Sequence, residues 1–145
     1  PNSAGTQKCI KGALAAADVK SSEIDLICGH LTSTMGDVLE VKNWSEALDL
    51  KGADFPKINA LKSMTGHCLS AAGAIESVAA ILQMEHNFQH ASLNCEDLHP
   101  SITETIDQKQ VVRQNTPAEN RIIAKSSFGF GDVNSCVIFK KWNND

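Results

Sequence analysis

Two histidines of this chain occupy positions at which an imidazole could take part in chemistry. His30 ends the apolar run 24–30, which predicts a buried strand, and α/β proteins tend to place their sites at the carboxyl ends of strands. His67 ends the polar segment 62–67 and directly precedes a long apolar stretch that predicts a helix. The positive end of a helix dipole favours a neutral imidazole, which can donate a hydrogen bond to an oxygen that gains negative charge. The expected chemistry is therefore stabilisation of an oxyanion.

A lysine and a glycine-rich turn complete this set of candidate residues. Lys62 begins the polar segment, while Gly129 and Gly131 lie in the turn 128–132, where they allow close approach of the backbone and exposed N–H groups. Each signal has an ordinary structural alternative, because a histidine can cap an element, a lysine can lie on the surface and such a turn can be a tight hairpin. Taken singly, none of these signals is specific.

The elements that must position these residues follow from the apolar periodicity of the chain. Helices are predicted at 5–17, 37–52 and 68–84, and extended segments at 24–30, 57–60, 121–127 and 133–140. The polar segment 88–120 contains Pro100 and Pro117 and is predicted to be mostly irregular. Because helices alternate with apolar strands, we expect an α/β layer architecture in a single domain that covers residues 1–145.

Three acidic residues of the predicted helices have specific expected roles. Asp37 is expected to be an N-cap, and Glu40, three residues further on, completes a capping-box pattern. Glu76 lies in the middle of the segment 68–84, which is apolar nearly all round and therefore predicts a helix buried on most faces. Because an unpaired buried carboxylate is costly, Glu76 should have a cationic or hydrogen-bonding partner.

Composition limits the classes of function that need to be considered. The 145 residues are 42% hydrophobic and 21% charged, as in a folded globular protein. A net charge of -4 argues against nucleic-acid binding, and no apolar run approaches the roughly 20 residues that cross a bilayer. The first residues, 1–3, include neither an initiator methionine nor a signal peptide, so a fragment or a processed chain is expected.

The cysteines argue against a metal or disulfide framework. Five of them are spaced widely and form no C-x-x-C pair, so neither a zinc site nor a thioredoxin-like motif is expected. Most lie among apolar neighbours, which favours reduced thiols in a cytoplasmic protein.

Together, three segments of this chain resemble the C-terminal half of elongating β-ketoacyl-carrier-protein synthases. The most specific block is Lys-Ser-Met-Thr-Gly-His at 62–67, followed by Ala-Ala-Gly-Ala-Ile-Glu at 71–76. His-Leu-Thr-Ser-Thr at 30–34 is similar to the family's His-Gly-Thr-Ser/Gly-Thr segment, and Ser-Phe-Gly-Phe-Gly at 127–131 is similar to its C-terminal loop. The resemblance extends over about residues 2–141.

The resemblance implies the second half of a thiolase-like α/β fold, a mixed sheet packed on a buried helix. It also implies a Cys-His-His site whose cysteine lies in the other half and accepts an acyl chain from acyl carrier protein. In the family, malonyl-carrier-protein then loses carbon dioxide and its carbanion attacks the acyl thioester. If the family's roles are transferred to this sequence, His30 and His67 would donate hydrogen bonds to the malonyl thioester oxygen. Lys62 would hold the hydrogen-bond network around the two histidines in place by pairing with Glu76.

The remaining implied roles concern the substrate and the partners. Thr32 and Thr34 would hydrogen-bond the phosphopantetheine arm, and Phe130 would supply a backbone N–H to an oxyanion hole while its ring gates the acyl pocket. The loop residues assigned to substrate binding or to its support are Phe128, Gly129, Phe130 and Gly131. No cofactor is implied beyond the phosphopantetheine of the carrier protein, which is the expected partner. We expect a homodimer for the full-length protein, a cytoplasmic location, and binding to neither nucleic acid nor membrane.

Three departures from the family pattern suggest a divergent branch that makes a specialised lipid or pigment. Leu31 stands where the family has glycine or alanine, and the segment 34–37 is one residue shorter than the usual Thr-Pro-Leu-Gly-Asp. Asp132 replaces the second glycine of the final loop and adds a charge that we expect beside the site.

Other interpretations are a non-catalytic partner subunit that resembles a chain-length factor, and a thiolase-type degradative enzyme. The first is disfavoured by retention of His30, Lys62 and His67. The second uses a cysteine near a C-terminal glycine-rich loop, and 128–132 has none. Cys68 is not expected to act as the nucleophile with the preceding histidine, since adjacent helix residues point about 100° apart. We therefore expect the chain alone to be inactive in condensation.

Overall fold

A four-stranded mixed sheet forms the centre of the molecule, and its strand order is β2-β1-β5-β6. The computed structural model describes residues 3–142. β1 pairs in parallel with β2 on one side and with β5 on the other, whereas β5 and β6 form an antiparallel hairpin. The strands are β1 (Leu26–Cys28), β2 (Lys57–Asn59), β5 (Ile122–Gly129) and β6 (Val133–Lys140).

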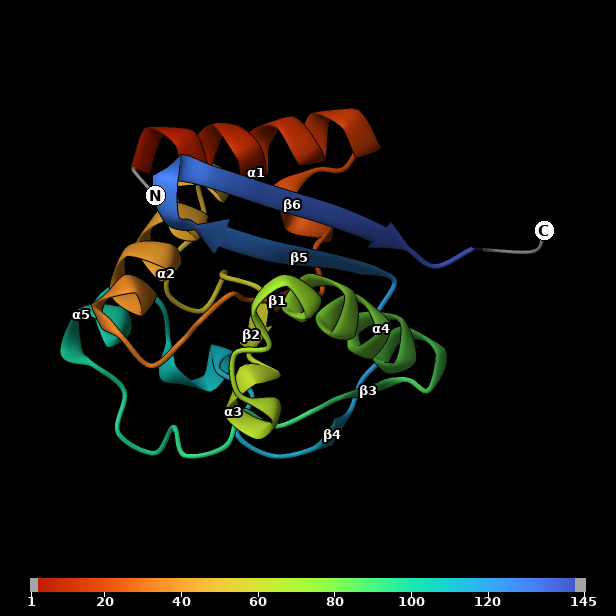
Figure 1. Ribbon diagram of the computed structural model, residues 1–145. Coiled ribbons are helices and arrows are strands. Elements are labelled where there is room, and N and C mark those ends of the chain that lie inside the picture. Colours follow the sequence, from red (N-terminus) through yellow and green to blue (C-terminus); the bar gives the residue numbers. More distant parts are fainter. Residues whose placement is uncertain (1–2, 143–145) are drawn as a thin grey trace.

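Helices cover both faces of this sheet, so the fold has three layers (Figure 1). α1 lies along β6 and packs against α2, while α4 lies across the opposite face of β5. The α-helices are α1 (Ser3–Ala17), α2 (Met35–Leu48), α3 (Lys62–Thr65), α4 (Ala72–Glu85) and α5 (Pro100–Thr103). Short 3₁₀ turns occur at Ser21–Glu23, Leu69–Ala71, Gln108–Gln110 and Phe130–Asp132, and β3 (Phe88–Gln89) pairs with β4 (Thr116–Pro117).

Two apolar clusters, one on each face of the sheet, hold the layers together. The larger lies between the sheet and the helices α1 and α2, and it includes Ile10, Ile27, Trp44, Ala124 and Phe128. The smaller lies between the sheet and α4, and it includes Leu26, Cys28, Ala80, Met84 and Ile123. Burial of these side chains is the main force that fixes the strand ends relative to the helices.

The alternation of side chains along β5 assigns its residues to opposite faces of the sheet. Ala124 and Phe128 belong to the cluster under α1 and α2, whereas Ile123 belongs to the cluster under α4. By the same alternation, Lys125 points toward α4 and Ser126 points toward α2. Both residues are buried, so each must find polar partners within the protein.

The predicted elements are confirmed for the most part, including strands in the regions 24–30, 57–60 and 121–127 and the strand at 133–140. The structure adds how the strands pair, which the sequence did not predict. The segment 88–120 is mostly irregular, as expected, with only two-residue strands and short helical turns. The predicted N-cap of the second helix is wrong. Thr34 is the N-cap, and its hydroxyl accepts a hydrogen bond from the Gly36 N–H at 3.1 Å. Asp37 and Glu40 lie inside the helix, where their carboxylates accept hydrogen bonds from the preceding loop instead.

The expectation that the helix after His67 is buried on most faces is also wrong for this chain. α4 buries only one face, and a row of apolar side chains on and before it is exposed: Leu69, Ile75, Val78, Ile81 and Leu82. Leu69 is 77% exposed and Val78 is 57% exposed. The helix is apolar nearly all round because one of its faces packs on the sheet and a second face is also apolar, although nothing in the described chain covers that second face.

Across residues 3–142, no helix combines the length and the apolar character that crossing a bilayer requires.

Candidate active site

The two histidines predicted from the sequence lie side by side. The ring centroids of His30 and His67 are 5.2 Å apart, and the ring planes meet at 80° in an edge-to-face arrangement. His30 follows the carboxyl end of β1, and His67 lies between α3 and the 3₁₀ turn that leads into α4. Parallel pairing of β1 with β2 brings these two chain segments to the same edge of the sheet.

The buried carboxylate of Glu40 holds the backbone that carries His30. Its Oε1 accepts hydrogen bonds from the His30 N–H at 2.7 Å and from the Ser126 hydroxyl at 3.0 Å, and its Oε2 accepts one from the Leu31 N–H at 3.0 Å. Gly29 permits this approach, because a Cβ at that position would lie 3.2 Å from Oε1 and 2.9 Å from the Leu31 side chain. Burial raises the pKa of the Glu40 carboxyl to about 7, although the His30 N–H and the Ser126 hydroxyl oppose that shift.

The loop after His30 is shaped by a second carboxylate. Asp37 accepts hydrogen bonds from the Thr32 N–H at 2.8 Å and from the Ser33 N–H at 3.1 Å. The hydroxyls of Thr32 and Thr34, both predicted to bind substrate, lie 3.1 Å apart. Ser33 has a left-handed φ of 58°, which turns the loop back toward α2. The two threonine hydroxyls therefore form one polar edge of the loop that follows His30.

The ring of His67 is oriented by the first turn of the following helix. Its Nδ1 accepts a hydrogen bond from the Leu69 N–H at 3.0 Å. A nitrogen that accepts a hydrogen bond carries no proton, so in this geometry the ring proton is on Nε2, which is a donor. Gly66 ends α3 with a φ of 70°, a conformation that suits glycine and that reverses the chain before His67.

Behind the histidines, one carboxylate faces two ammonium groups. Glu76 forms the predicted ion pair with Lys62 through Oε1, and Lys125 Nζ lies 2.7 Å from Oε2. Lys125 therefore forms a second ion pair with the same carboxylate, and its ammonium also donates a hydrogen bond to the Ser127 hydroxyl. The side chains of Lys62, Glu76 and Lys125 expose only 5%, 4% and 3% of their surface. We call these three residues the buried charge cluster.

This environment keeps the His30 imidazole neutral near pH 7. Burial lowers the pKa of His30 to about 4, and the ammonium of Lys62 and the imidazole of His67 contribute in the same direction. Lys125 also lowers this pKa, whereas the carboxylate of Glu76 opposes the shift. Nδ1 of His30 is buried and has no hydrogen-bond partner among residues 3–142. A neutral imidazole with one N–H is the form that can donate to an oxygen on a substrate.

The glycine-rich loop corrects two expectations. Phe128 is buried in the core under α1 and α2, so its ring lies away from α4 and does not line the site. The carboxylate of Asp132 lies against Gly5 of α1, where a Cβ would clash with it, and its charge therefore faces α1. Phe130 is fully exposed in this chain, and its role as a gate stays a prediction. Gly131 has a φ of 75°, and Gly129, in an extended conformation, ends β5.

A cavity of about 220 Å³ is lined by His67 and by Leu31, the residue that follows His30. Lys62, His67 and Thr32 contribute to its wall, and the opposite wall includes Ser92 and Leu93. A larger cavity, about 450 Å³, lies on the far side of β2 and shares only Val111 with the first.

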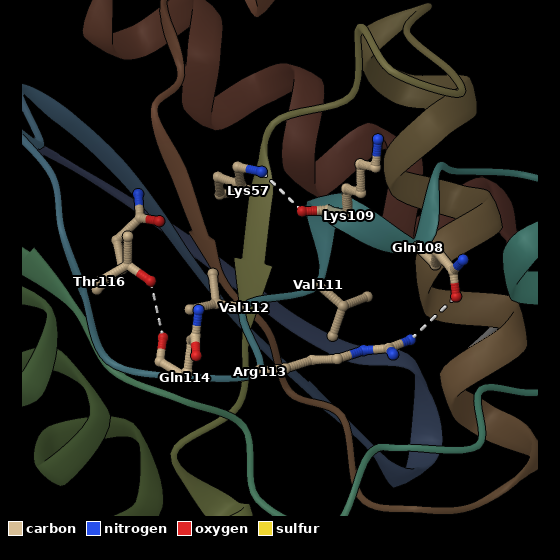
Figure 2. Close-up of a pocket in the computed structure, with 9 residues that line it drawn as sticks. Lys57, Gln108, Lys109, Val111, Val112, Arg113, Gln114 and Thr116 are labelled. Atoms are coloured by element: carbon tan, nitrogen blue, oxygen red, sulfur yellow. Dashed lines mark hydrogen bonds between the residues drawn. The ribbon is translucent and has the colours of Figure 1, made fainter.

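Figure 2 shows the side chains that line the larger cavity, and they do not include the kinds of catalytic group found beside the smaller cavity. The Lys57 ammonium donates a hydrogen bond to the Lys109 carbonyl at 2.6 Å, and Arg113 contacts the Gln108 side chain at 3.5 Å. The residues that line it include no histidine, cysteine or carboxylate. The smaller cavity, whose wall includes His67, is therefore the candidate site.

None of the cysteines is placed as an activated nucleophile. Burial raises the pKa of the Cys9, Cys28, Cys95 and Cys136 thiols, to about 12 for Cys28 and Cys136, so these thiols stay protonated near neutral pH. The Cys68 thiol points toward the carbonyl oxygens of Thr65 and Gly66 at 3.8 Å. All five cysteines are free thiols. Among the described residues, no group of histidine, cysteine and carboxylate side chains is arranged to hold a metal ion.

Sequence reasoning missed Lys125 and Ser126 and gave Glu40 the wrong role. A signal for Lys125 was available, because a lysine directly follows the apolar residues 122–124 within a predicted strand. No local pattern reports that Ser126 meets Glu40, since the two residues are 86 positions apart.

The fold and the histidine pair agree with the comparison against protein families. Residues 1–96 match the family described as beta-ketoacyl synthase, C-terminal domain. This chain belongs to that family, and its fold is the C-terminal half of the thiolase-like ketosynthase fold.

Three relatives illustrate the similarity. 3-Oxoacyl-[acyl-carrier-protein] synthase 1 of Haemophilus influenzae is 35% identical over 99% of this chain and 33% of its own length. The ishigamide ketosynthase/chain length factor structure is 31% identical, with a TM-score of 0.89 over 99% of this chain and 34% of that one. A type II polyketide synthase acyl-carrier protein in complex with its ketosynthase gives 28% identity and a TM-score of 0.78, over 98% of this chain and 34% of that one. The chain thus spans about a third of the length of the relatives that it matches.

Proposed function

We propose that this chain supplies the histidine half of the active site of a 3-oxoacyl-[acyl-carrier-protein] synthase. The observation that carries the proposal is the pair of imidazoles 5.2 Å apart, with the buried charge cluster behind them and a cavity that His67 lines. Relatives with this name cover the whole chain at 35% identity. The nucleophilic cysteine would come from a segment outside the 145 residues.

In the proposed reaction, the malonyl thioester binds with its carbonyl oxygen between His30 and His67. The bond between the α-carbon and the carboxylate breaks, carbon dioxide leaves, and the electron pair moves onto the thioester oxygen as an enolate. The Nε2–H of His67 and one N–H of the neutral His30 donate to that oxygen, as donors in an oxyanion hole do. The α-carbon then attacks the acyl group on the cysteine, and the cysteine thiolate leaves.

The partner and the carrier arm belong to the same proposal. An acyl carrier protein would deliver both substrates on phosphopantetheine, in keeping with the carrier protein named in the related complex. The hydroxyls of Thr32 and Thr34 would contact the arm, and Phe130 would offer its backbone N–H to the acyl oxygen. A homodimer of the full-length protein and a cytoplasmic location remain parts of this proposal.

A non-catalytic subunit is the second candidate, because one similar structure is of a ketosynthase/chain length factor. His30, Lys62 and His67 are all present and grouped in this chain, which favours the catalytic role. A subunit without catalysis would have no need for a half-buried, neutral imidazole at His30.

The test is the H67A variant of the full-length protein. We expect malonyl decarboxylation to fall at least about a hundredfold, the loss typical of one oxyanion donor, while acyl transfer to the cysteine falls much less. His86, an exposed histidine at the end of α4, provides the matched control, and H86A should leave both steps unchanged. Equal losses in the two half-reactions would show that His67 has a different role, and a wild-type protein without decarboxylation would refute the proposed function.

A further inference from the structure

Lys125 is a buried cation in a strand that is otherwise apolar up to that point. It pairs across the sheet with Cys28, two residues before His30, so its backbone lies at the edge where the histidines meet. The preceding residues on β5, Ile123 and Ala124, are completely buried core residues. A buried ammonium carries a desolvation cost that an apolar side chain of the same size would not carry. Its presence therefore calls for a role beyond packing.

The buried charge cluster contains one ammonium more than its carboxylate neutralises. Lys62 alone would balance Glu76, as the ion pair between them shows. Lys125 adds a second positive charge 2.7 Å from the same carboxylate. Glu40, the other buried carboxylate close by, lies on the α2 side of the sheet and is bound by the backbone of His30 and Leu31 and by the Ser126 hydroxyl. The cluster behind the histidines is therefore net cationic.

We infer that Lys125 is a positioning residue for the condensation site, whose surplus charge favours negative charge on an oxygen held by the two histidines. This inference rests on the proposed function, because it assigns the charge to the decarboxylation step. Lys125 does not touch the substrate, and it acts through Glu76 and through the field of the cluster. The cluster itself is buried, and the field of a buried charge is screened less than that of a surface charge.

The experiment compares variants of the full-length protein in malonyl-thioester decarboxylation. K125M and K125Q remove the charge, and K125Q retains a donor for the Ser127 hydroxyl. Either variant should lower kcat for decarboxylation about tenfold, less than the loss of a direct donor, with KM and acyl transfer to the cysteine within about twofold of wild type. K125R keeps the charge and should recover most of the rate. S127A is the matched control, since it removes the hydrogen bond but keeps the charge, and it should remain within about twofold of wild type.

A double variant separates charge from structure. E76Q/K125M leaves Lys62 as the single charge of the cluster, so its net charge is again +1, and we expect it to decarboxylate at least about threefold faster than K125M. The inference is overturned if K125M keeps the wild-type rate, if the double variant is no faster than K125M, or if only variants with a charge at position 125 fold. A wild-type protein that does not decarboxylate malonyl thioesters would instead refute the proposed function.

Discussion

Replacement of Glu76 by glutamine removes the carboxylate that faces both ammonium groups of the buried charge cluster. In the wild-type protein one carboxylate oxygen meets Lys62, and the other lies 2.7 Å from Lys125. The amide of E76Q has one oxygen to share between the two cations, and its NH₂ group would face the other ammonium as a second donor. The net charge of the cluster rises from +1 to +2 at a place that water does not reach.

The structure sets the expected magnitude. All three side chains are at least nine-tenths buried, so solvent cannot compensate for the missing charge. Removing one partner of a buried ion pair costs about 3–5 kcal/mol. Because Glu76 serves two cations, we expect the E76Q variant of the full-length protein to lose stability at the upper end of that range. Urea unfolding followed by circular dichroism would measure the loss.

Two comparisons make this prediction specific. Glu85 is an exposed carboxylate at the end of the same helix, and E85Q should change the free energy of unfolding by no more than about 0.5 kcal/mol. Removal of Lys125 as well should relieve part of the damage, so E76Q/K125M should be more stable than E76Q by at least about 1 kcal/mol. If the two substitutions were simply additive, or if E76Q were as stable as wild type, the assignment of a buried and net cationic cluster would be wrong.

Three further predictions concern pH and the exposed helix. Burial raises the pKa of Glu40 from 4.5 to about 7, so the folded state binds this proton more tightly, and the stabilisation present below pH 4.5 is lost as pH rises to 7. Relative to wild type, E40Q should therefore gain stability over this range, by at most about 1.4 kcal/mol per pH unit in urea titrations. The pKa of His30 is lowered from 6.5 to about 4, so the stabilisation that the neutral imidazole provides is present above pH 6.5 and is lost as pH falls to 4. The H30Q variant should therefore gain stability relative to wild type as pH falls over this range. Curves of unfolding free energy against pH that run parallel to the wild-type curve would contradict the assignments for Glu40 and His30. The 145-residue chain expressed alone should self-associate, because the exposed face of α4 is apolar. V78K should reduce the association that sedimentation velocity measures, and a monomeric wild-type chain would contradict this prediction.

The sequence by itself determined the elements and the residues that their ends present. Apolar periodicity predicts a helix over 5–17 and two strands at the C-terminal end, and all three are present. The same patterns place His30 after a strand and His67 before a helix, and the cost of burying Glu76 predicts its cationic partner. These inferences succeed because they depend on spacing along the chain and on the chemistry of single side chains.

Only the tertiary structure decided which side chains meet across the sheet and which faces are covered. The contact of Glu40 with Ser126 and the charge of Lys125 behind the histidines depend on the pairing of β1 with β5, which no local pattern encodes. The resemblance assigns the whole loop that contains Phe128 to the site, but it does not show which face of the sheet each side chain of β5 occupies, and Phe128 lies in the core. The apolar composition of the α4 segment likewise indicates that it is suited to burial, but it does not show whether another part of this chain covers the face that carries Val78. The hydrophobic effect is non-directional, so it does not specify which surface packs against an apolar face.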